Sequence, residues 1–199
     1  MSEKTQQRKL ALRDRLVAAA EARIEQAGLP SLRARDLATD SGCSLVAIYN
    51  VYDDLNAVVM AVNGRTFRKL GITVAESVAD ATSVAPTQRL IIMSNAYLHF
   101  AAEHKNLWRA LFDVQMSTDG MVPDWYLAVL RGLFQHISEP LAEIFPNKNT
   151  NDLDLMTRAL FSSVHGIVLL GLENRISGVP IERVKDMLAQ VLEEIGEKN

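Results

Sequence analysis

Residues 44–52, SLVAIYNVY, bring together a serine hydroxyl, two phenols and an amide within about two helical turns. Ser44 predicts a helix N-cap, because its hydroxyl can accept an amide of the first turn, and the amides at such a terminus suit a phosphate. The hydroxyls of Tyr49 and Tyr52 are also suited to phosphate. The amide of Asn50 matches the edge of adenine. These groups have the chemistry of a surface that binds nucleic acid.

The apolar positions around these groups fit the same interpretation. Val46 and Ala47 can contact a thymine methyl group. Each residue also has a structural alternative: Tyr49 as a core aromatic, Asn50 as a helix cap, and the arginines as solvated side chains. The predicted DNA-binding residues are Arg33, Arg35, Ser44, Leu45, Val46, Ala47, Tyr49, Asn50 and Tyr52.

Two short helices must position these side chains. The first is predicted over 32–40. It is followed by Gly42, whose backbone can adopt the left-handed conformation that often ends a helix. The second is predicted over 45–52, with Ile48 on its buried side. Two helices joined by a short turn that contains glycine form a helix-turn-helix, whose second helix enters the major groove.

Charge is distributed unevenly along the 199 residues. The segment up to Arg35 contains eight basic and four acidic residues, a net charge of +4. Since the whole chain has a net charge of −3, the residues after Arg35 carry −7. An N-terminal arm with Lys4, Arg8 and Lys9 can thus reach phosphate or the minor groove.

The single cysteine, Cys43, cannot form an internal disulfide. We expect it to fill the place of a small apolar residue in the turn and not to act as a redox sensor. We further expect a cytoplasmic protein without a secretion signal, and no membrane partner, because no apolar run approaches the roughly 20 residues of a span.

Hydrophobic spacing is helical nearly throughout, so an all-α fold of about nine helices is predicted, with a helix-turn-helix domain at 1–52 and a helical ligand-binding and dimerisation domain at 53–199. Pro140 should kink or break the helix predicted over 123–145.

The helix at 152–175 is apolar nearly all round, and the next, at about 181–196, carries a narrow apolar seam. These two helices predict a homodimer that closes as a four-helix bundle, unless the intervening helices cover them within one chain. The seam consists of Ile181, Val184, Leu188, Val191 and Ile195.

The stretch Gly42-Cys43-Ser44, then Ile48-Tyr49, then Tyr52 and Val58 resembles the TetR family of bacterial transcriptional regulators, over about residues 8–62. Val164-His165-Gly166-Ile167 with Leu172-Glu173 resembles one subgroup of that family. The chain departs from the family pattern at Val46, usually Gly or Pro, at Leu55, usually a phosphate-binding Lys, and at Tyr52, usually Phe. Loss of that lysine removes roughly 1–2 kcal/mol of sequence-independent DNA affinity. The resemblance implies a dimeric repressor that binds a palindromic double-stranded DNA operator and is released by a small-molecule effector.

The resemblance places Arg35 near the major groove, where its guanidinium can bind guanine. It also implies an effector cavity among the later helices. Few charged residues lie on their inner faces, which favours an apolar or aromatic effector, although rings and Met at helical spacing also suit a core. His165 is either a hydrogen-bonded core histidine or a cavity group. The candidate ligand-binding residues are Met93, Tyr97, Phe100, Trp108, Phe112, Met116, Trp125, Tyr126, Phe134 and His165.

Other classes of function receive less support from the sequence. No metal motif, phosphate loop, Rossmann glycine pattern or G-x-S-x-G motif occurs, so we expect neither an enzyme nor a cofactor or metal. The alternative is a helical dimeric ligand- or partner-binding protein with a degenerate DNA-binding head. The apolar recognition helix and Leu55 keep this alternative open.

Overall fold

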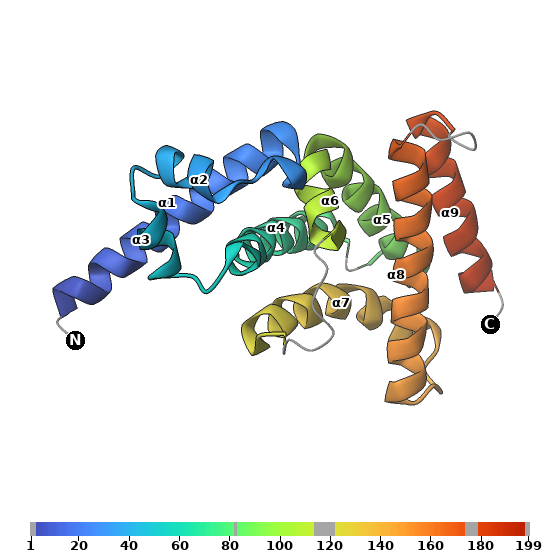
Figure 1. Cartoon of the computed structure of the whole chain (residues 1–199). Coiled ribbons are helices and arrows are strands. Elements are labelled where there is room, and N and C mark those ends of the chain that lie inside the picture. Colours follow the sequence, from blue (N-terminus) through green and yellow to red (C-terminus); the bar gives the residue numbers. More distant parts are fainter. Residues whose placement is uncertain (1–2, 82, 114–121, 174–178, 198–199) are drawn as a thin grey trace. The chain divides into compact units, whose positions relative to one another are not determined.

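The computed structural model describes residues 3–81, 83–113, 122–173 and 179–197, and the part of the chain so described is helical without strands (Figure 1). This confirms the predicted all-α class. A 3-10 turn, η1, spans Leu29–Ser31. The α-helices are α1 (Glu3–Ala27), α2 (Ala34–Asp40), α3 (Leu45–Tyr49), α4 (Leu55–Ser77), α5 (Pro86–Glu103), α6 (Lys105–Asp113), α7 (Asp124–Ile144), α8 (Thr150–Leu172) and α9 (Ile181–Glu197).

The helices pack into two compact units. We call Met1–Arg68 with His104–Tyr126 the head unit, and Lys69–Glu103 with Leu127–Asn199 the body unit. The long helices α4 and α7 contribute residues to both. These are units of packing, and the functional division at residues 52 and 53 remains a prediction.

The head unit is built on α1, whose residues Leu16, Ala20 and Ile24 recur every four positions and are fully buried. Leu37 of α2 and Ile48 of α3 complete this core, and both are also 0% exposed. Burial of each such aliphatic side chain contributes about 1.5–3 kcal/mol. The core therefore fixes α2 and α3 against α1.

Helix α6 also belongs to the head unit, although the sequence placed it with the effector-binding helices. Leu107 and Ala110 of α6 are buried in the head core. Asn106 donates to the Glu25 carbonyl at 2.9 Å, and buried Asn63 of α4 donates to the Ala110 carbonyl at 2.8 Å. These bonds satisfy backbone carbonyls near helix ends, so they fix α6 to α1 and α4.

The proline in α7 does not end that helix, so a break at Pro140 is not observed. A proline within a helix removes one backbone hydrogen bond and crowds the preceding turn. Pro140 and Leu141 are both buried. We attribute the continuous helix to this burial, which offsets the lost bond.

In the body unit α5 packs against α8 and α9, and these two pack against each other. The buried side of α9 consists of Val184, Leu188 and Leu192. Of the predicted seam, Val184 and Leu188 lie on this buried side, whereas Ile181 and Val191 are 38% and 37% exposed. Helix α9 is thus apolar on two sides, and the residues that the structure describes cover one of them.

Helix α8 is long and apolar enough, by length and composition, to cross a membrane, which corrects the expectation that no segment approaches that length. Of its most apolar stretch of 18 residues, 17% is buried by the part of the chain that the structure describes. Core helices of soluble proteins meet the same criterion, so length and composition alone do not assign α8 to a membrane. The low burial does show that the described part of the chain leaves most of this apolar stretch uncovered.

Candidate nucleic-acid interface and effector cavity

The turn between α2 and α3 has the geometry that its sequence predicts. Gly42 adopts a φ of +61°, and the amides of Gly42 and Cys43 bond back to the carbonyls of Thr39 and Ala38 at 3.1 and 2.9 Å. The hydroxyl of Ser44 accepts the Ala47 amide at 3.2 Å, which caps α3. The predicted helix-turn-helix is therefore present.

Helix α3 has a buried side and an open side. Ile48 is completely buried, whereas Val46, Tyr49 and Leu45 are 68%, 48% and 38% exposed. Asn50 follows the helix as its C-cap and is exposed as well. Exposure of three large apolar or aromatic side chains on one short helix is the arrangement expected of a contact surface.

The recognition helix is shorter than predicted, because it ends at Tyr49 instead of Tyr52. Val51 is 5% exposed, so the chain leaves the helix there to bury this side chain in the head core. Asp54 then accepts the Ala57 amide at 2.7 Å and caps α4. Burial of Val51 therefore sets the end of α3, and the cap at Asp54 sets the start of α4.

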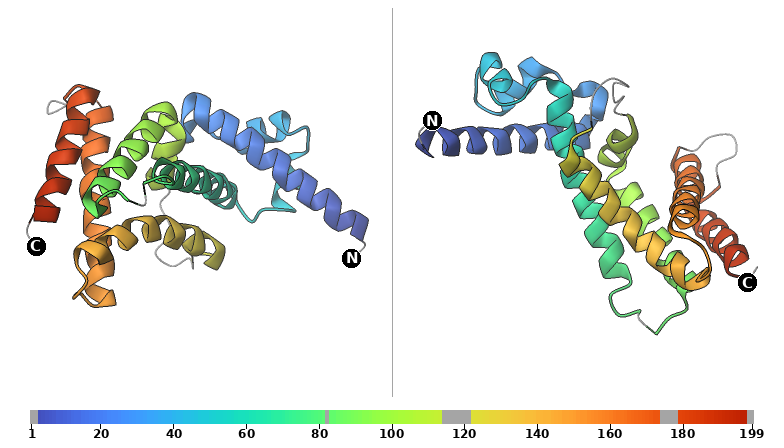
Figure 2. Two further views of the ribbon diagram at one scale, coloured as in Figure 1. Left: turned by 180° about the vertical axis from the view of Figure 1, so that it is seen from behind. Right: turned by 90° about the horizontal axis from the view of Figure 1, so that it is seen from below.

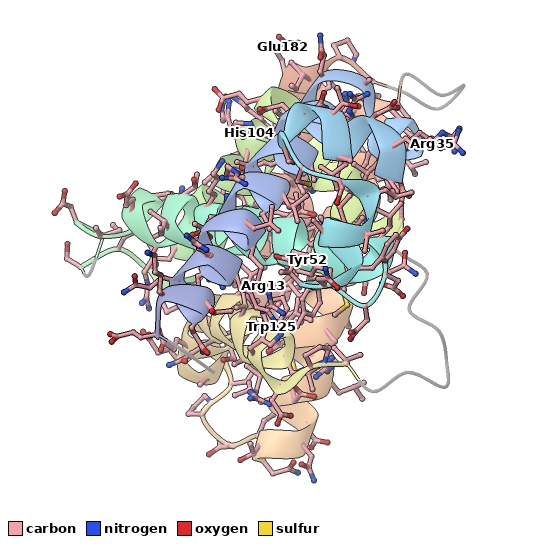
Figure 3. The ribbon with its side chains drawn as sticks, turned by 60° about the vertical axis from the view of Figure 1, so that its left-hand side comes forward. Arg13, Arg35, Tyr52, His104, Trp125 and Glu182 are labelled. Carbon is pink, nitrogen blue, oxygen red and sulfur yellow. The ribbon has the colours of Figure 1, made fainter. Side chains whose placement is uncertain are left out.

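Tyr52 is held by Arg13 of α1, as Figure 3 shows. The guanidinium lies 5.1 Å from the ring centroid, and its Nε donates to the Val51 carbonyl at 2.9 Å. Burial raises the pKa of the Tyr52 phenol, and the positive charges of Arg13 and Arg65 partly oppose this shift. Tyr52 thus remains a neutral hydroxyl at the end of the recognition segment.

The two arginines before α3 lie on the surface. Arg33 occupies the N-cap position of α2 without a side-chain cap bond, and Arg35 is exposed on that helix. In Figure 3 the side chain of Arg35 extends away from α2 into open space. Both guanidinium groups are therefore available to an anionic partner.

A small cavity lies inside the body unit. Its volume is about 50 Å³, and its walls are almost entirely carbon. Met93 and Tyr97 are the two candidates that line it. Sequence reasoning chose aromatic and Met residues and so missed the other lining residues, which are mostly aliphatic: Val74, Leu90, Ser94, Leu133, Ile137, Leu160, Phe161, Val164 and Leu192.

A cluster of rings adjoins this cavity. The Tyr97 hydroxyl lies 2.8 Å from Nδ1 of His165, and Phe161 stacks on the imidazole at 5.8 Å between centroids. Phe134 meets Phe161 edge to face at 5.3 Å. Burial lowers the pKa of His165, so this ring is neutral at pH 7. His165 and Phe134 therefore support the cavity wall from behind.

The other candidate effector residues lie elsewhere. Phe100 is buried in the body unit but does not line this cavity. Trp108, Phe112, Trp125 and Tyr126 belong to the head unit, and Met116 lies outside the described residues. Trp125 packs on Gly64 of α4, where an added Cβ would stand 2.7 Å from its ring.

Across the described residues, no group of three or more His, Cys, Asp or Glu side chains could hold a metal ion. The buried side chain of Asn63 instead serves helix packing through its bond to the Ala110 carbonyl. The geometry offers an exposed recognition helix and an apolar cavity.

Residues 90–195 match the sequence model of the tetracyclin repressor-like C-terminal domain. Similar solved structures include a protein of unknown function from Rhodococcus sp. RHA1 (21% identity, TM-score 0.73, covering 92% of this chain and 94% of that one). They also include RolR in complex with the ligand resorcinol (17%, 0.69, 98% and 97%) and a TetR-family transcriptional regulator from Streptomyces coelicolor (16%, 0.64, 98% and 82%). No curated protein matches the sequence. At these identities the structures share the fold.

Proposed function

The chain belongs to the tetracyclin repressor-like family of transcriptional regulators, and from that premise we propose that it is a cytoplasmic homodimeric repressor that binds a palindromic operator and is released by a small apolar or aromatic effector. The observation that carries the proposal is helix α3. Its Ile48 is fully buried while Val46 and Tyr49 on its other side stand open. An anchored helix with an open outer side is what the major groove accepts.

On this proposal the contacts divide into two kinds. Tyr49, Tyr52, Arg33 and the N-terminus of α3 at Ser44 bind phosphates and set the register. The side chains of Arg35, Leu45, Val46, Ala47 and Asn50 meet base edges. Arg13 supports the first group, because it holds Tyr52 in place.

The proposed dimer forms through α8 and α9. Leu155 and Leu170 of α8 are 67% and 48% exposed, and Met187 of α9 is 41% exposed. A hollow of about 380 Å³ lies along the two helices beside Ser163 and Gly166. Small residues there let a second helix approach closely, and a two-fold axis would pair each open apolar side with its copy.

The proposed effector site is the body-unit cavity. Pockets that hold ligands usually measure roughly 300–1,000 Å³, so the 50 Å³ cavity must widen to admit one. Its lining bears no charged group, and burying an unpaired charge there would be costly. Resorcinol, the ligand in the RolR structure, is likewise a small neutral aromatic molecule. Helices α4 and α7 line the cavity at Val74 and Leu133, and both also contribute residues to the head unit. On this proposal these two helices transmit effector binding to the head unit, which then releases the DNA.

The salt dependence of DNA binding tests this proposal against the alternative of a degenerate head. The protein is titrated onto the DNA upstream of its own gene and onto a random duplex of equal length, at 50–200 mM salt. A regulator binds the upstream DNA more tightly and loses affinity steeply as salt rises. Equal, weak binding to both duplexes would instead favour the ligand- or partner-binding protein.

A further inference from the structure

Two hollows adjoin on the surface of the head unit, on the side formed by α1, α4 and the start of α7. Their volumes are about 280 and 270 Å³, so each is larger than the body-unit cavity of about 50 Å³. They share the lining residues Arg13, Tyr52, Ala61 and Trp125, and we call the two together the head hollow. Ligand pockets usually start at roughly 300 Å³, so the head hollow reaches that size without widening.

Small side chains of α4 leave room for this hollow. Ala61 and Gly64 lie three residues apart, on one side of the helix. Trp125 packs against Gly64, and its neighbour Tyr126 meets Phe67 edge to face at 5.8 Å, which fixes the start of α7 on α4. Figure 2 shows the first turn of α7 beside α4 in both of its views. The ring of Trp125 thus forms a wall of the hollow and is still 44% exposed.

Helix α1 supplies another wall. It begins at Glu3, so the basic N-terminal arm that the charges suggested is helical. Spacings of three and four residues place the lining side chains of α1 on one side of the helix. They are Leu10, Arg13, Asp14 and Val17. This wall is therefore apolar at its two ends and charged between them.

Arg13 is the cation that both hollows share. Its Nε donates to the Val51 carbonyl at 2.9 Å, and no other acceptor within the described residues takes its two terminal nitrogens. Figure 3 shows Arg13 close to Tyr52 and Trp125, in agreement with the hollow that all three line. A guanidinium whose terminal N–H groups are free can bind a carboxylate through two parallel hydrogen bonds. Arg13 therefore offers the hollow a carboxylate-binding group.

The other charges of the head hollow favour an anion beside Arg13. Arg65 pairs with Asp14 at 3.4 Å, so these two charges largely offset each other. Arg68 has no carboxylate partner in the part of the chain that the structure describes. The remaining carboxylate, Asp53, lines the hollow that lacks Arg65 and Arg68. Arg13 and Arg68 thus leave positive charge at one end of the head hollow.

We propose that the head hollow binds a small planar aromatic carboxylate, whose carboxylate pairs with Arg13 while its ring packs on Trp125. The ring of Trp125 is the largest apolar group in the hollow, and a purely polar anion would leave it unused. This ligand differs from the effector of the body-unit cavity, whose lining bears no charged group. Because Arg13 also holds Tyr52, the bound ligand would lie beside the end of the recognition segment.

Calorimetric titration of the full chain with cinnamate and with its neutral analogue cinnamide tests the ligand class. We expect cinnamate to bind at least about ten-fold more tightly, because the amide lacks the charge that pairs with Arg13. Inorganic phosphate at equal concentration should not displace cinnamate, because it gains nothing from the ring of Trp125. Equal affinity for acid and amide, displacement by phosphate, or no saturable binding of cinnamate at millimolar concentration would overturn the proposal.

Three variants locate the bound cinnamate. Arg13→Gln should weaken its binding by at least about ten-fold, whereas Arg15→Gln, an exposed position on the same helix that lines neither hollow, should bind as the wild type does. Ala61→Leu keeps every charge but fills the space that both hollows share, so it should also weaken binding. Wild-type affinity in Arg13→Gln or in Ala61→Leu would overturn the proposal. These titrations contain no DNA, so that result would leave the proposed function intact.

Discussion

Tyr49 and Val46 lie on the open side of α3, and we expect them to make different kinds of contact. Tyr49 ends in a hydroxyl, which suits phosphate, and Val46 presents only methyl groups, which suit the edge of thymine. Their exposures of 48% and 68% leave both free to reach DNA. At the scale of single residues, we therefore expect Tyr49 to set the register of the protein on the DNA and Val46 to help read the base sequence.

Replacing Tyr49 by Phe should weaken binding to all DNA sequences alike by about five-fold, the effect of one lost hydrogen bond of about 1 kcal/mol. Val46→Ala is the matched change on the same helix, and it should weaken the operator more than a random duplex. Fluorescence anisotropy on both duplexes measures the difference. An unchanged affinity in Tyr49→Phe would remove its phosphate assignment.

His165 should make stability depend on pH. Burial lowers its pKa in the folded protein, so as the pH falls below about 6.5 the unfolded chain binds a proton that the folded chain does not. The free energy of unfolding therefore decreases as the pH falls through this window. Urea unfolding at pH 7.5 and 5.5 should show a smaller difference for His165→Phe than for the wild type. Equal differences would argue against a buried, neutral imidazole.

At the scale of elements, two glycines illustrate how the turn before α3 depends on backbone conformation. Gly42 ends α2 with a φ of +61°, whereas Gly71 lies inside α4. An added Cβ would meet nothing within 4 Å at either position. Their substitutions by Ala thus differ only in backbone conformation.

Gly42→Ala should reduce the free energy of unfolding by about 1–2 kcal/mol, because other residues resist the left-handed region. Gly71→Ala should leave stability unchanged or raise it by up to about 1 kcal/mol, since alanine favours the helix interior. Chemical denaturation of the two variants provides the comparison. A destabilised Gly71→Ala with an intact Gly42→Ala would contradict the turn geometry.

Element-level prediction succeeded where sequence spacing and local capping agree. Ser44, Gly42 and buried Ile48 define the helix-turn-helix from neighbouring residues alone. The end of α3 was missed because burial of Val51 and the Arg13–Tyr52 contact depend on α1, which is distant in sequence. The aliphatic cavity walls were missed for the same reason, since Leu133 or Leu160 looks identical in a core and in a cavity.

At the scale of the whole molecule, the proposal requires two copies of the chain. Helices α8 and α9 each have one apolar side packed within the body unit and a second side open. The sequence indicated excess apolar surface, but it did not separate the two sides of α9. That separation depends on which residues face α5, and it leaves Met187 and Val191 for a partner.

Leu170→Glu should shift the protein towards a monomer, with a dimer dissociation constant at least about a hundred-fold higher, because a carboxylate would be buried in an apolar interface. Ile72→Glu makes the same change at a 57% exposed position on α4 and should leave the dimer intact. Analytical ultracentrifugation at micromolar concentration distinguishes the two variants. Dimerisation of both variants alike would place the interface elsewhere.

Footprinting of the wild-type protein on the DNA upstream of its own gene tests most directly whether paired α3 helices read one duplex. The account predicts two protected half-sites related by a two-fold axis, with centres separated by about one helical turn of 10 base pairs or a multiple of it. Absence of protection at physiological salt, or a single unpaired protected patch, would contradict it.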